Sequence, residues 1–566
     1  MISYQGLSQN GYKLNFNLLD VIDSKIIKPY LNLEGDSITL LYKLDELKTD
    51  FQKSGYWAAS LDSIQFDSAN IYINFYQGRK YSVGAIDVSA IEAWVLDEIN
   101  FNRKRKLTLD FAGIQKIEKN ILSVYENNGY PFANVFLDSV EIYDSIFEAK
   151  LVAQKGKYYF IDSIIVKGDI KISYNYIEKI IQISSNQEFN QGAISDIKKQ
   201  IDNLRFLSEI KPAEIEFKKD AVDLYLYLEK KKANRFNGII GFLPENEETG
   251  KLLITGELNL NLVNSFGQGE EIILDWEKLE SSTQKLNIGF SYPYIFKSNL
   301  GFDFGFGLYK KDSTYLSLNA DLGLRLFLSS TDYAKLYYRY KSSSKIGDDI
   351  SGAYVNYADV NSNIIGGAYY LNRIDYLQNP RKGVELNLFA GVGFKNLKNA
   401  GKLSDSLNIA LDDRTIELES GLDFDMYFPI YNNFVFHFRN NTRYMNQFSD
   451  VESVYFENEL FRFGGAKTLR GFDESIFFAS IYSIQDIEIK YLFERNSAFY
   501  VFWNGAYYYQ DITQSTAEDF PWGFGIGLDF ETKAGIFSLS YALGKQFDNP
   551  FEIKSAKIHF GYISRF

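Results

Sequence analysis

The chain has 566 residues, no cysteine and a net charge of −13. The lack of cysteine excludes disulfides, thiol catalysis and thiolate metal sites, and the acidic balance argues against nucleic acid as a partner, because phosphate binding needs concentrated cations. No run of 18 or more apolar residues occurs, which excludes helical membrane spans. Aromatic residues form 17% of the chain, an enrichment typical of β-strands and of membrane interfaces.

The first part of the chain contains a repeated unit. A Gly-Tyr step follows a helical stretch and precedes a strand at Tyr56 and again at Tyr130, and the sequence restarts at Gly78 and Gly156. The spacing of apolar residues predicts a helix before each Gly-Tyr step, with Leu41, Leu44, Leu47 and Phe51 in the first copy and Ile114, Ile117, Ile121 and Tyr125 in the second. A weaker third copy has a helix predicted over 194–210, followed by two strands.

Each copy is predicted to consist of a strand, two helices and a strand pair, a β-α-α-β-β order. The first copy lacks an obvious opening strand. The predicted boundaries are 1–78, 79–156 and 157–234, and residues 235–566 form a separate region.

From about residue 236 onward, apolar residues alternate with polar or small ones. In KLLITGELNLNL, residues 251–262, the even positions are apolar or glycine, whereas Thr255, Glu257 and Asn259 face the other way. The same period-2 pattern runs through residues 302–308, 316–326, 384–394, 416–428 and 434–438. These strands are long for a soluble sheet, and about ten residues suit a tilted strand that crosses a bilayer.

This alternation predicts a transmembrane β-barrel. Every backbone amide in lipid must be paired within the protein, and a closed antiparallel barrel is the only sheet that achieves this. At about 20 residues per strand and turn, residues 236–566 accommodate roughly sixteen strands. Tyr292 and Tyr294 are expected to be aromatic caps at the membrane interface. A large soluble all-β domain is the alternative that alternation leaves open.

The C-terminal sequence AKIHFGYISRF alternates as well. Ile558, Phe560, Tyr562 and Phe566 oppose His559 and Gly561, and the last residue is aromatic. This pattern resembles the C-terminal signal by which outer-membrane barrels are recognised for insertion. A plain terminal strand is the alternative interpretation.

One segment near the end, FRFGGAKTLRGFDES at 461–475, is too irregular for a strand. It combines a glycine pair with an Arg-Gly-Phe step, namely Gly464, Gly465, Arg470, Gly471 and Phe472. Glycine permits tight backbone turns, and an arginine can fix a loop through charge-assisted hydrogen bonds. An exposed surface loop is the alternative.

With these repeats, this barrel and this loop, the chain resembles the BamA/TamA superfamily of outer-membrane assembly proteins over essentially its whole length. The repeats resemble POTRA (polypeptide-transport-associated) domains. The resemblance implies that the loop enters the barrel and that Arg470 meets acidic residues on the two strands that follow. On the first strand Glu488 matches the acid. On the second, a Phe-x-Asp-x-Gly pattern falls on Phe502, Asn504 and Ala506, so that Asn504 replaces the acid and Glu488 is expected to provide more of the attraction.

The resemblance also implies a function in protein insertion into, or translocation across, the outer membrane. Unfolded outer-membrane or secreted proteins would pair with POTRA sheet edges by β-augmentation and enter lipid through a lateral seam between the first and last barrel strands. The first strand is expected around Arg235–Phe242 and the last at Ile558–Phe566. Gly238 and Gly241 weaken the first strand, and Phe560, Tyr562 and Phe566 of the last strand are expected to face them at the seam. Outer-membrane lipid and periplasmic or lipoprotein subunits are further expected partners.

The expected location is the bacterial outer membrane, with the repeats in the periplasm. The start, MISYQGLSQNGYKLNF, shows no signal peptide, so the numbering is expected to begin after a processed or trimmed leader. Two other functions stay open at this stage. One is an exporter of a single dedicated exoprotein, of the two-partner kind, and the other is a passive channel.

No catalytic or cofactor site is predicted. The two histidines, His437 and His559, lie on different predicted strands without ligand-like neighbours and are expected to face the lumen. Nucleophile, zinc-protease and phosphate-loop motifs are absent from the sequence. The sequence therefore predicts a protein that is not an enzyme and that uses neither metal nor cofactor.

Overall fold

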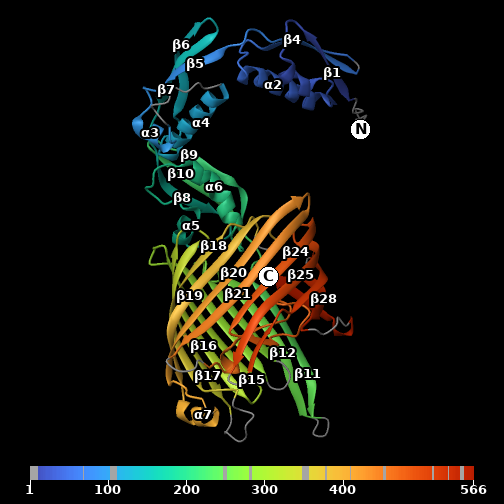
Figure 1. The fold of residues 1–566 in the computed structure, drawn as a ribbon. Helices are drawn as coiled ribbons and strands as arrows, with labels where there is room; N and C mark the ends of the chain where they lie inside the picture. The colour runs from blue at the N-terminus through green and yellow to red at the C-terminus, as the bar shows by residue number, and fades with distance from the viewer. Residues whose placement is uncertain are drawn as a thin grey trace, which may run out of the picture. The chain divides into compact units, whose positions relative to one another are not determined.

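The computed structural model describes residues 11–67, 69–101, 111–246, 251–278, 283–346, 356–376, 379–407, 409–449, 454–512, 515–532, 535–547 and 553–565. The chain forms two compact units. One comprises Met1–Ile164, Ser185–Ser195 and Ile215–Leu224, and the other Ile165–Ser184, Asp196–Glu214 and Tyr225–Phe566. Their helices and strands are labelled in Figure 1.

The first repeat does have an opening strand, so the expectation that it lacks one was wrong. Its elements are β1 (Tyr12–Leu18), α1 (Ser24–Ile27), η1 (Lys28–Tyr30), β2 (Glu34–Gly35), α2 (Ser37–Lys53), β3 (Ser60–Phe66) and β4 (Asn70–Tyr76). The sheet order is β2-β1-β4-β3, with β1 parallel to β4. The helix α2 begins after Asp36, whose carboxylate accepts a hydrogen bond from the Thr39 N–H as an N-cap.

The core of the first repeat lies between α2 and the sheet. Leu44, Leu47 and Phe51 are buried there with the apolar side chains of β4. The fourth residue of this helix face is Leu40, which is 2% exposed, and not the predicted Leu41, which is 39% exposed. Helical periodicity explains the correction, because position 40 lies one turn before position 44 on the same face.

The other two repeats share the topology of the first. The second consists of β5 (Ser82–Asp87), α3 (Ala93–Glu98), α4 (Phe111–Asn127), β6 (Asn134–Tyr143) and β7 (Ile146–Gln154). The third consists of β8 (Phe160–Lys167), α5 (Tyr174–Ile181), α6 (Gln191–Asp202), β9 (Leu207–Phe217) and β10 (Ala221–Lys230). Their sheet orders are β5-β7-β6 and β8-β10-β9, so the last strand is central in both. The helix predicted over 194–210 was too long, since Leu207–Phe217 is a strand.

The Gly-Tyr step that reveals the repeat ends a helix. Gly55 and Gly129 adopt φ values of +99° and +89°, a left-handed conformation that glycine adopts without steric cost. The next N–H groups reach back to the helix, Tyr56 to the Phe51 carbonyl and Tyr130 to the Tyr125 carbonyl, both at 3.0 Å. This is the Schellman pattern of helix termination, and it accounts for the repeated dipeptide.

The C-terminal region is an antiparallel barrel, as predicted. Its strands are β11 (Arg235–Asn246), β12 (Lys251–Val263), β13 (Glu271–Lys278), β14 (Gln284–Ile295), β15 (Leu300–Lys311), β16 (Tyr315–Phe327), β17 (Tyr333–Lys345), β18 (Val360–Asn372), β19 (Gly383–Leu397), β20 (Arg414–Tyr431), β21 (Phe434–Phe448), β24 (Ile481–Glu494), β25 (Ser497–Ile512), β26 (Ser515–Asp519), β27 (Trp522–Glu531), β28 (Gly535–Lys545) and β29 (Lys557–Arg565). Because β26 and β27 both pair with β25 and are separated only by Phe520 and Pro521, they form one interrupted strand and the barrel has sixteen.

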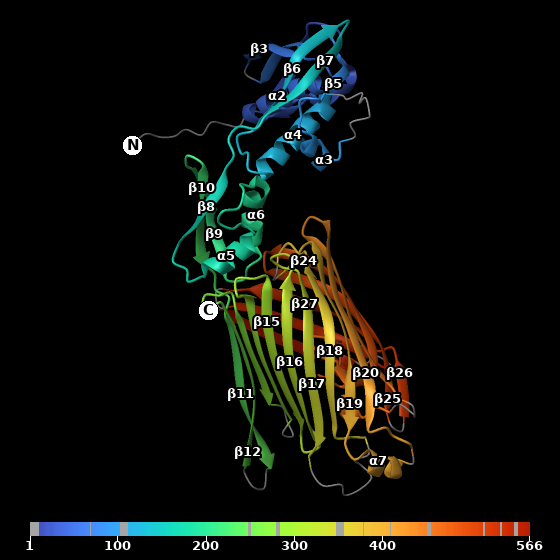
Figure 2. The ribbon, with the colours of Figure 1, turned by 90° about the vertical axis from the view of Figure 1, so that its left-hand side faces the viewer.

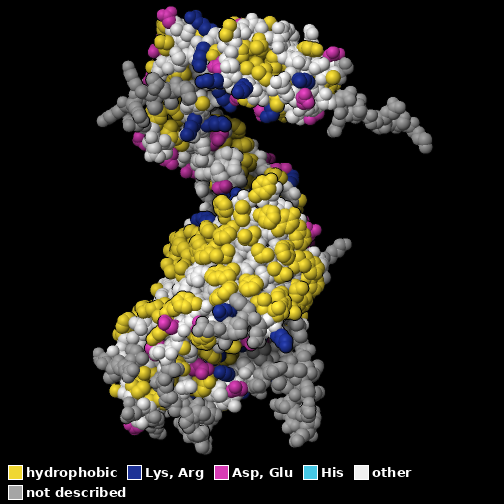
Figure 3. Space-filling model, turned by 45° about the vertical axis from the view of Figure 1, so that its right-hand side comes forward, with side chains coloured by type: hydrophobic (Ala, Val, Ile, Leu, Met, Phe, Trp, Pro, Cys, Tyr) yellow, Lys and Arg dark blue, Asp and Glu magenta, His cyan; other side chains and the backbone are white. Residues whose placement is uncertain are grey.

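The two faces of the barrel differ in polarity, as the alternation predicted. On β16, Leu322, Leu324 and Leu326 point outward and are exposed, whereas Asp321 on the other face pairs with Arg339 of β17 at 2.6 Å. Apolar side chains accordingly form a broad band on the face of the barrel seen in Figure 3, and neighbouring strands such as β15 to β18 run side by side in Figure 2. Among the described helices, none has the length and apolar character of a membrane span.

One predicted membrane cap is buried instead. Tyr294, near the end of β14, is 5% exposed and has a left-handed φ of +54°. Its ring lies 5.8 Å from that of Tyr176 on α5, and its carbonyl accepts a hydrogen bond from Asn175. The aromatic side chain therefore contacts α5 rather than lipid.

Replacing Phe51 by alanine tests the core of the first repeat. Phe51 is fully buried and its ring packs 4.9 Å from that of Phe75. We expect Phe51→Ala to destabilise this repeat by about 3–5 kcal/mol, measured as faster hydrogen exchange in peptides of α2 and β4 in the full chain. Ile38→Ala on the same helix is the control, because Ile38 is exposed. Equal exchange in both variants would contradict this assignment of the core.

Candidate functional site: the lumen loop and the barrel seam

The segment between β21 and β24 folds back against the barrel wall. Within this lumen loop, residues 454–480, β22 (Phe461–Phe463) pairs with β23 (Phe477–Ala479) as a hairpin. Its buried residues pack on one face of β24 and β25, namely Tyr482, Ile484, Ala506 and Tyr508. The opposite face of β24 carries the exposed side chains Ile487, Ile489 and Tyr491. The loop therefore lies inside the barrel.

Three glycines of the motif adopt conformations that other residues disfavour. Gly464, Gly465 and Gly471 have φ values of +114°, +98° and +95°. Gly471 also brings the loop backbone close to β28, because a Cβ there would lie 2.7 Å from the Gly544 nitrogen. The motif thus lets Arg470 sit directly against the wall.

Arg470 is buried and makes the main polar contacts of the loop. Its Nη1 donates to Glu488 Oε1 at 2.7 Å and its Nη2 donates to Asp486 Oδ1 at 2.5 Å. Its guanidinium lies 3.6 Å from the centroid of the Phe502 ring, a cation–π contact. Charge-assisted bonds of this kind are the stronger class of hydrogen bond, and we call Arg470 with Asp486, Glu488 and Phe502 the loop anchor.

Asn504, the departure from the family pattern, is fully buried beside the anchor. Its amide satisfies both of its neighbours when the oxygen accepts from the Arg470 backbone N–H at 2.8 Å and the nitrogen donates to the Gly523 carbonyl at 3.2 Å. An amide supplies both an acceptor and a donor, which a carboxylate cannot do. Asn504 therefore fits a site between one N–H and one carbonyl.

The structure thus brings Arg470, Glu488, Phe502 and Asn504 together. Sequence analysis missed Asp486, which accepts the second hydrogen bond of the guanidinium. The available signal was strand parity, because positions 486 and 488 of β24 face the same side. Phe472, the last residue of the motif, packs on Phe477 with ring centroids 5.1 Å apart.

The anchor continues into a wider polar cluster. Glu488 also contacts Lys490 at 2.9 Å and His437 Nδ1 at 3.0 Å. His437 is buried and stacks on Tyr427 with ring centroids 4.3 Å apart. His437 is therefore part of the site, although sequence analysis treated it only as a lumen-facing imidazole.

The first arm of the lumen loop makes a second attachment to other wall strands. Glu457 pairs with Lys311 of β15 at 3.2 Å and Glu459 with Lys395 of β19 at 2.7 Å. Between them, Asn458 donates to the Ser343 hydroxyl of β17 and to the Ala358 carbonyl, each at 2.8 Å. The loop therefore connects two separate parts of the barrel wall.

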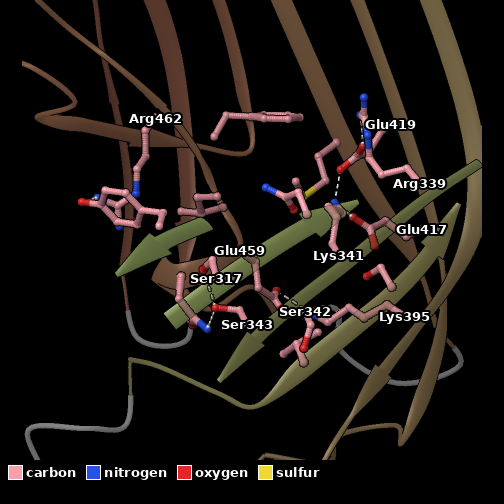
Figure 4. Close-up of a pocket in the computed structure, with 18 of the residues that line it drawn as sticks. Ser317, Arg339, Lys341, Ser342, Ser343, Lys395, Glu417, Glu419, Glu459 and Arg462 are labelled. Carbon is pink, nitrogen blue, oxygen red and sulfur yellow. Dashed lines mark hydrogen bonds and ion pairs between the residues drawn. The ribbon is translucent and has the colours of Figure 1, made fainter. Parts of the chain in front are cut away.

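Beside this arm is a cavity of about 390 Å³, shown in Figure 4. Several of its charged side chains pair with one another: Lys341 with Glu417 at 2.7 Å, Arg339 with Glu419 at 3.3 Å, and Lys341 also with Glu419. Within the described residues, no group of three or more His, Cys, Asp or Glu side chains could hold a metal ion. The cavity is a polar part of the lumen and shows no set of residues arranged for catalysis.

The junction between β11 and β29, the seam, is much weaker than the other strand pairings. Among the residues that the structure describes, the two strands pair through Arg235 with Arg565 and Phe236 with Ser564. On its other edge β11 pairs with β12 from Arg235 to Asn246. Among the described residues, β11 beyond Phe236 therefore has no partner strand at the seam.

The residues predicted for the seam lie beyond its paired part. Gly238 and Gly241 pair with Leu258 and Thr255 of β12. On β29, Phe560 is 67% exposed and Tyr562 packs on Phe537 of β28, with ring centroids 4.6 Å apart. Phe566 lies outside the described residues. Their role in lateral opening is a proposal taken up below.

Three β-α-α-β-β repeats ahead of a sixteen-stranded barrel with an inward-folded loop define a class of outer-membrane protein transporters. The chain belongs to the Omp85 superfamily, whose domain model matches residues 264–566, more than half of its length. The chain is accordingly an outer-membrane β-barrel with periplasmic POTRA repeats. The predicted family, fold class and location are confirmed.

Individual relatives are distant. The outer membrane protein assembly factor BamA of Neorickettsia risticii (strain Illinois) is 21% identical over 397 residues, which are 62% of this chain and 50% of that protein. The chain thus spans half the length of this curated relative. Among solved structures, CdiB from Escherichia coli matches with a TM-score of 0.52 and 14% identity, and CdiB from Acinetobacter baumannii with 0.51 and 13%, each covering 97% of this chain and 100% of that chain. These structures show the same fold.

Removing the anchor arginine tests its contribution to stability. Arg470→Ala leaves Asp486 and Glu488 buried without their shared cation, which costs about 3–5 kcal/mol, measured by denaturant unfolding of the barrel. Lys557→Ala is the control, because Lys557 pairs with Asp473 of the same loop at 2.5 Å but at an exposed site, where a pair is worth about 0–1 kcal/mol. Similar losses in both variants would show that the anchor is no stronger than a surface pair.

Restoring the family acid tests the fit of Asn504. Asn504→Asp is expected to destabilise the barrel, because a carboxylate can accept from the Arg470 N–H but faces the Gly523 carbonyl with an acceptor. The same unfolding experiment measures the effect, and Asn504→Gln shows how much of it comes from side-chain shape. A more stable Asn504→Asp variant would contradict the assigned amide contacts.

Proposed function

We propose that the protein is an insertase of the outer membrane, which receives unfolded client proteins at its POTRA repeats and passes them into lipid through the β11–β29 seam. The observation that supports this most directly is the seam itself, with two residue pairs between β11 and β29. An unpaired strand edge is a template for another strand. A client strand can add there by β-augmentation and satisfy its backbone groups in the membrane.

The described geometry also argues against a passive channel. The lumen loop is attached to β24 through Arg470 and to β15, β17 and β19 through Glu457, Asn458 and Glu459. The hairpin of the loop therefore occupies part of the lumen, and a lateral route does not require that it leave. In this proposal, the residues of the loop anchor and of the seam are the parts of the protein that carry out insertion.

A dedicated exporter of one secreted protein is the second candidate. The fold similarity to the two CdiB chains, over 97% of this chain, supports this candidate. The sequence similarity to a BamA assembly factor supports an assembly function instead. Depletion of the protein followed by proteomics of the outer membrane separates the two. Broad loss of barrel proteins supports the insertase, and loss of one secreted protein with an intact barrel population supports the exporter.

A disulfide across the seam tests lateral opening. The chain has no native cysteine, and Phe236 and Ser564 are direct partners, at a separation that suits a disulfide in antiparallel strands. We expect the oxidised Phe236→Cys/Ser564→Cys variant to lose insertion of an unfolded barrel client into proteoliposomes, and to regain it after reduction.

The matched control locks the neighbouring strand pair. A Cβ at Gly561 of β29 would lie 3.6 Å from the Ser538 Cβ of β28, within the range of disulfides. The oxidised Ser538→Cys/Gly561→Cys variant is expected to keep its activity, because β28 and β29 need not separate. Full insertion by the oxidised seam variant would refute lateral opening.

A further inference from the structure

His437 occupies an unusual position beside the loop anchor. It lies on β21, is 2% exposed, and stacks almost flat on Tyr427 of β20, with an angle of 4° between the rings. Its Nδ1 lies 3.0 Å from Glu488 Oε2 of β24 and its Nε2 lies 2.8 Å from Asp425 Oδ1 of β20. Both ring nitrogens therefore face carboxylate oxygens.

These two contacts need more protons than a neutral imidazole can supply. A neutral imidazole has one N–H donor and one acceptor nitrogen, and an ionised carboxylate only accepts. One of the two short contacts would then place a lone pair of His437 against an oxygen of Asp425 or Glu488. Either His437 carries protons on both nitrogens, or one of the carboxyl groups is protonated.

The charges around His437 favour the doubly protonated ring. The cations are Arg439, which donates to Asp425 at 2.9 Å, Lys490, which contacts Glu488 at 2.9 Å, and Arg470 of the loop. Three carboxylates contact His437 or Arg470 directly, namely Asp425 of β20 and Asp486 and Glu488 of β24. Two more lie in the same polar cluster: Asp529 of β27, which interacts electrostatically with Lys490, Glu488 and Arg470, and Glu385 of β19, which interacts with Tyr427. Carboxylates thus outnumber the fixed cations, and an imidazolium reduces the excess.

We propose that His437 is a positioning residue of the loop anchor, held as an imidazolium that bridges Asp425 and Glu488 and fixes the carboxylate that receives Arg470. The inference deepens the proposed function and rests on it, in that the anchored loop is taken to be part of the machinery. Because Glu488 Oε1 accepts from Arg470 while Oε2 faces His437, removal of the second proton turns an attractive contact into a repulsive one on the same carboxylate. Without the imidazolium, Glu488 is therefore less firmly held for Arg470.

The first test reads the protonation state directly. The chain has two histidines, so the full-length His559→Gln variant, labelled with nitrogen-15 histidine, gives the ring signals of His437 alone. We expect both ring nitrogens to be protonated in the folded barrel at pH 7. A neutral ring with one unprotonated nitrogen would mean that His437 is not an imidazolium, and would overturn the proposal.

The second test follows the loop. Leu469 is fully buried beside Arg470, and with no native cysteine a Leu469→Cys variant reports release of the loop through its rate of thiol labelling. Rates are normalised to the denatured protein at each pH, which removes the ionisation of the thiol itself. We expect slow labelling of the Leu469→Cys parent, and fast labelling at every pH of a Leu469→Cys/His437→Gln variant.

His559 provides the matched control for this test. It lies on β29 and its Nε2 has no hydrogen-bond partner within the described residues, so a Leu469→Cys/His559→Gln variant is expected to label like the Leu469→Cys parent. Labelling of the His437→Gln variant as slow as that of the parent would overturn the proposal. Neither test involves a client protein, so their failure is distinguishable from failure of the seam experiment.

Discussion

The buried contact of Arg470 with Asp486 and Glu488 is the interaction on which the interior of the barrel depends. Three charged groups out of water are stable only when each is paired, and the pairing here fixes the loop to β24 with two hydrogen bonds of 2.7 and 2.5 Å. The glycines make this approach possible, and Phe502 covers the guanidinium. Without this contact, the hairpin of β22 and β23 would depend on its apolar packing and on the other polar contacts of the loop with the wall.

The barrel contrasts a strongly fixed interior with a weakly closed seam. Within the described residues the loop is attached through the anchor, through Glu457 to Glu459 and through Asp473, whereas β11 and β29 share two residue pairs. A rigid loop beside β24 and β25 stabilises the C-terminal strands as a group. The compliant place in the sheet is then its first strand, which suits the lateral route proposed above.

Much of this fold was predictable because lipid and water impose a period of two on every strand, and because Gly-Tyr steps end helices in the same way in two repeats. Contacts between distant segments were not predictable. Leu207 and Ile210 continue the apolar spacing of the preceding helix although Leu207–Phe217 is a strand, and Tyr294 is buried where α5 packs on it. Glu488 could be predicted from the family motif, and Asp486 could have been predicted from the alternation of side chains along β24. Asp425 could not, because it contacts His437 from a different strand, β20.

The approach of Gly471 to Gly544 has a consequence for how the sequence can vary. Each glycine would push a Cβ into the backbone of the other at 2.7 Å, so any side chain at either position would act as a wedge between loop and wall. The displaced strand, β28, is hydrogen-bonded to β29, the last strand of the sheet. The displacement caused by a single added methyl group would therefore pass from β28 to β29, the strand at which the barrel closes. Both positions are accordingly constrained to glycine.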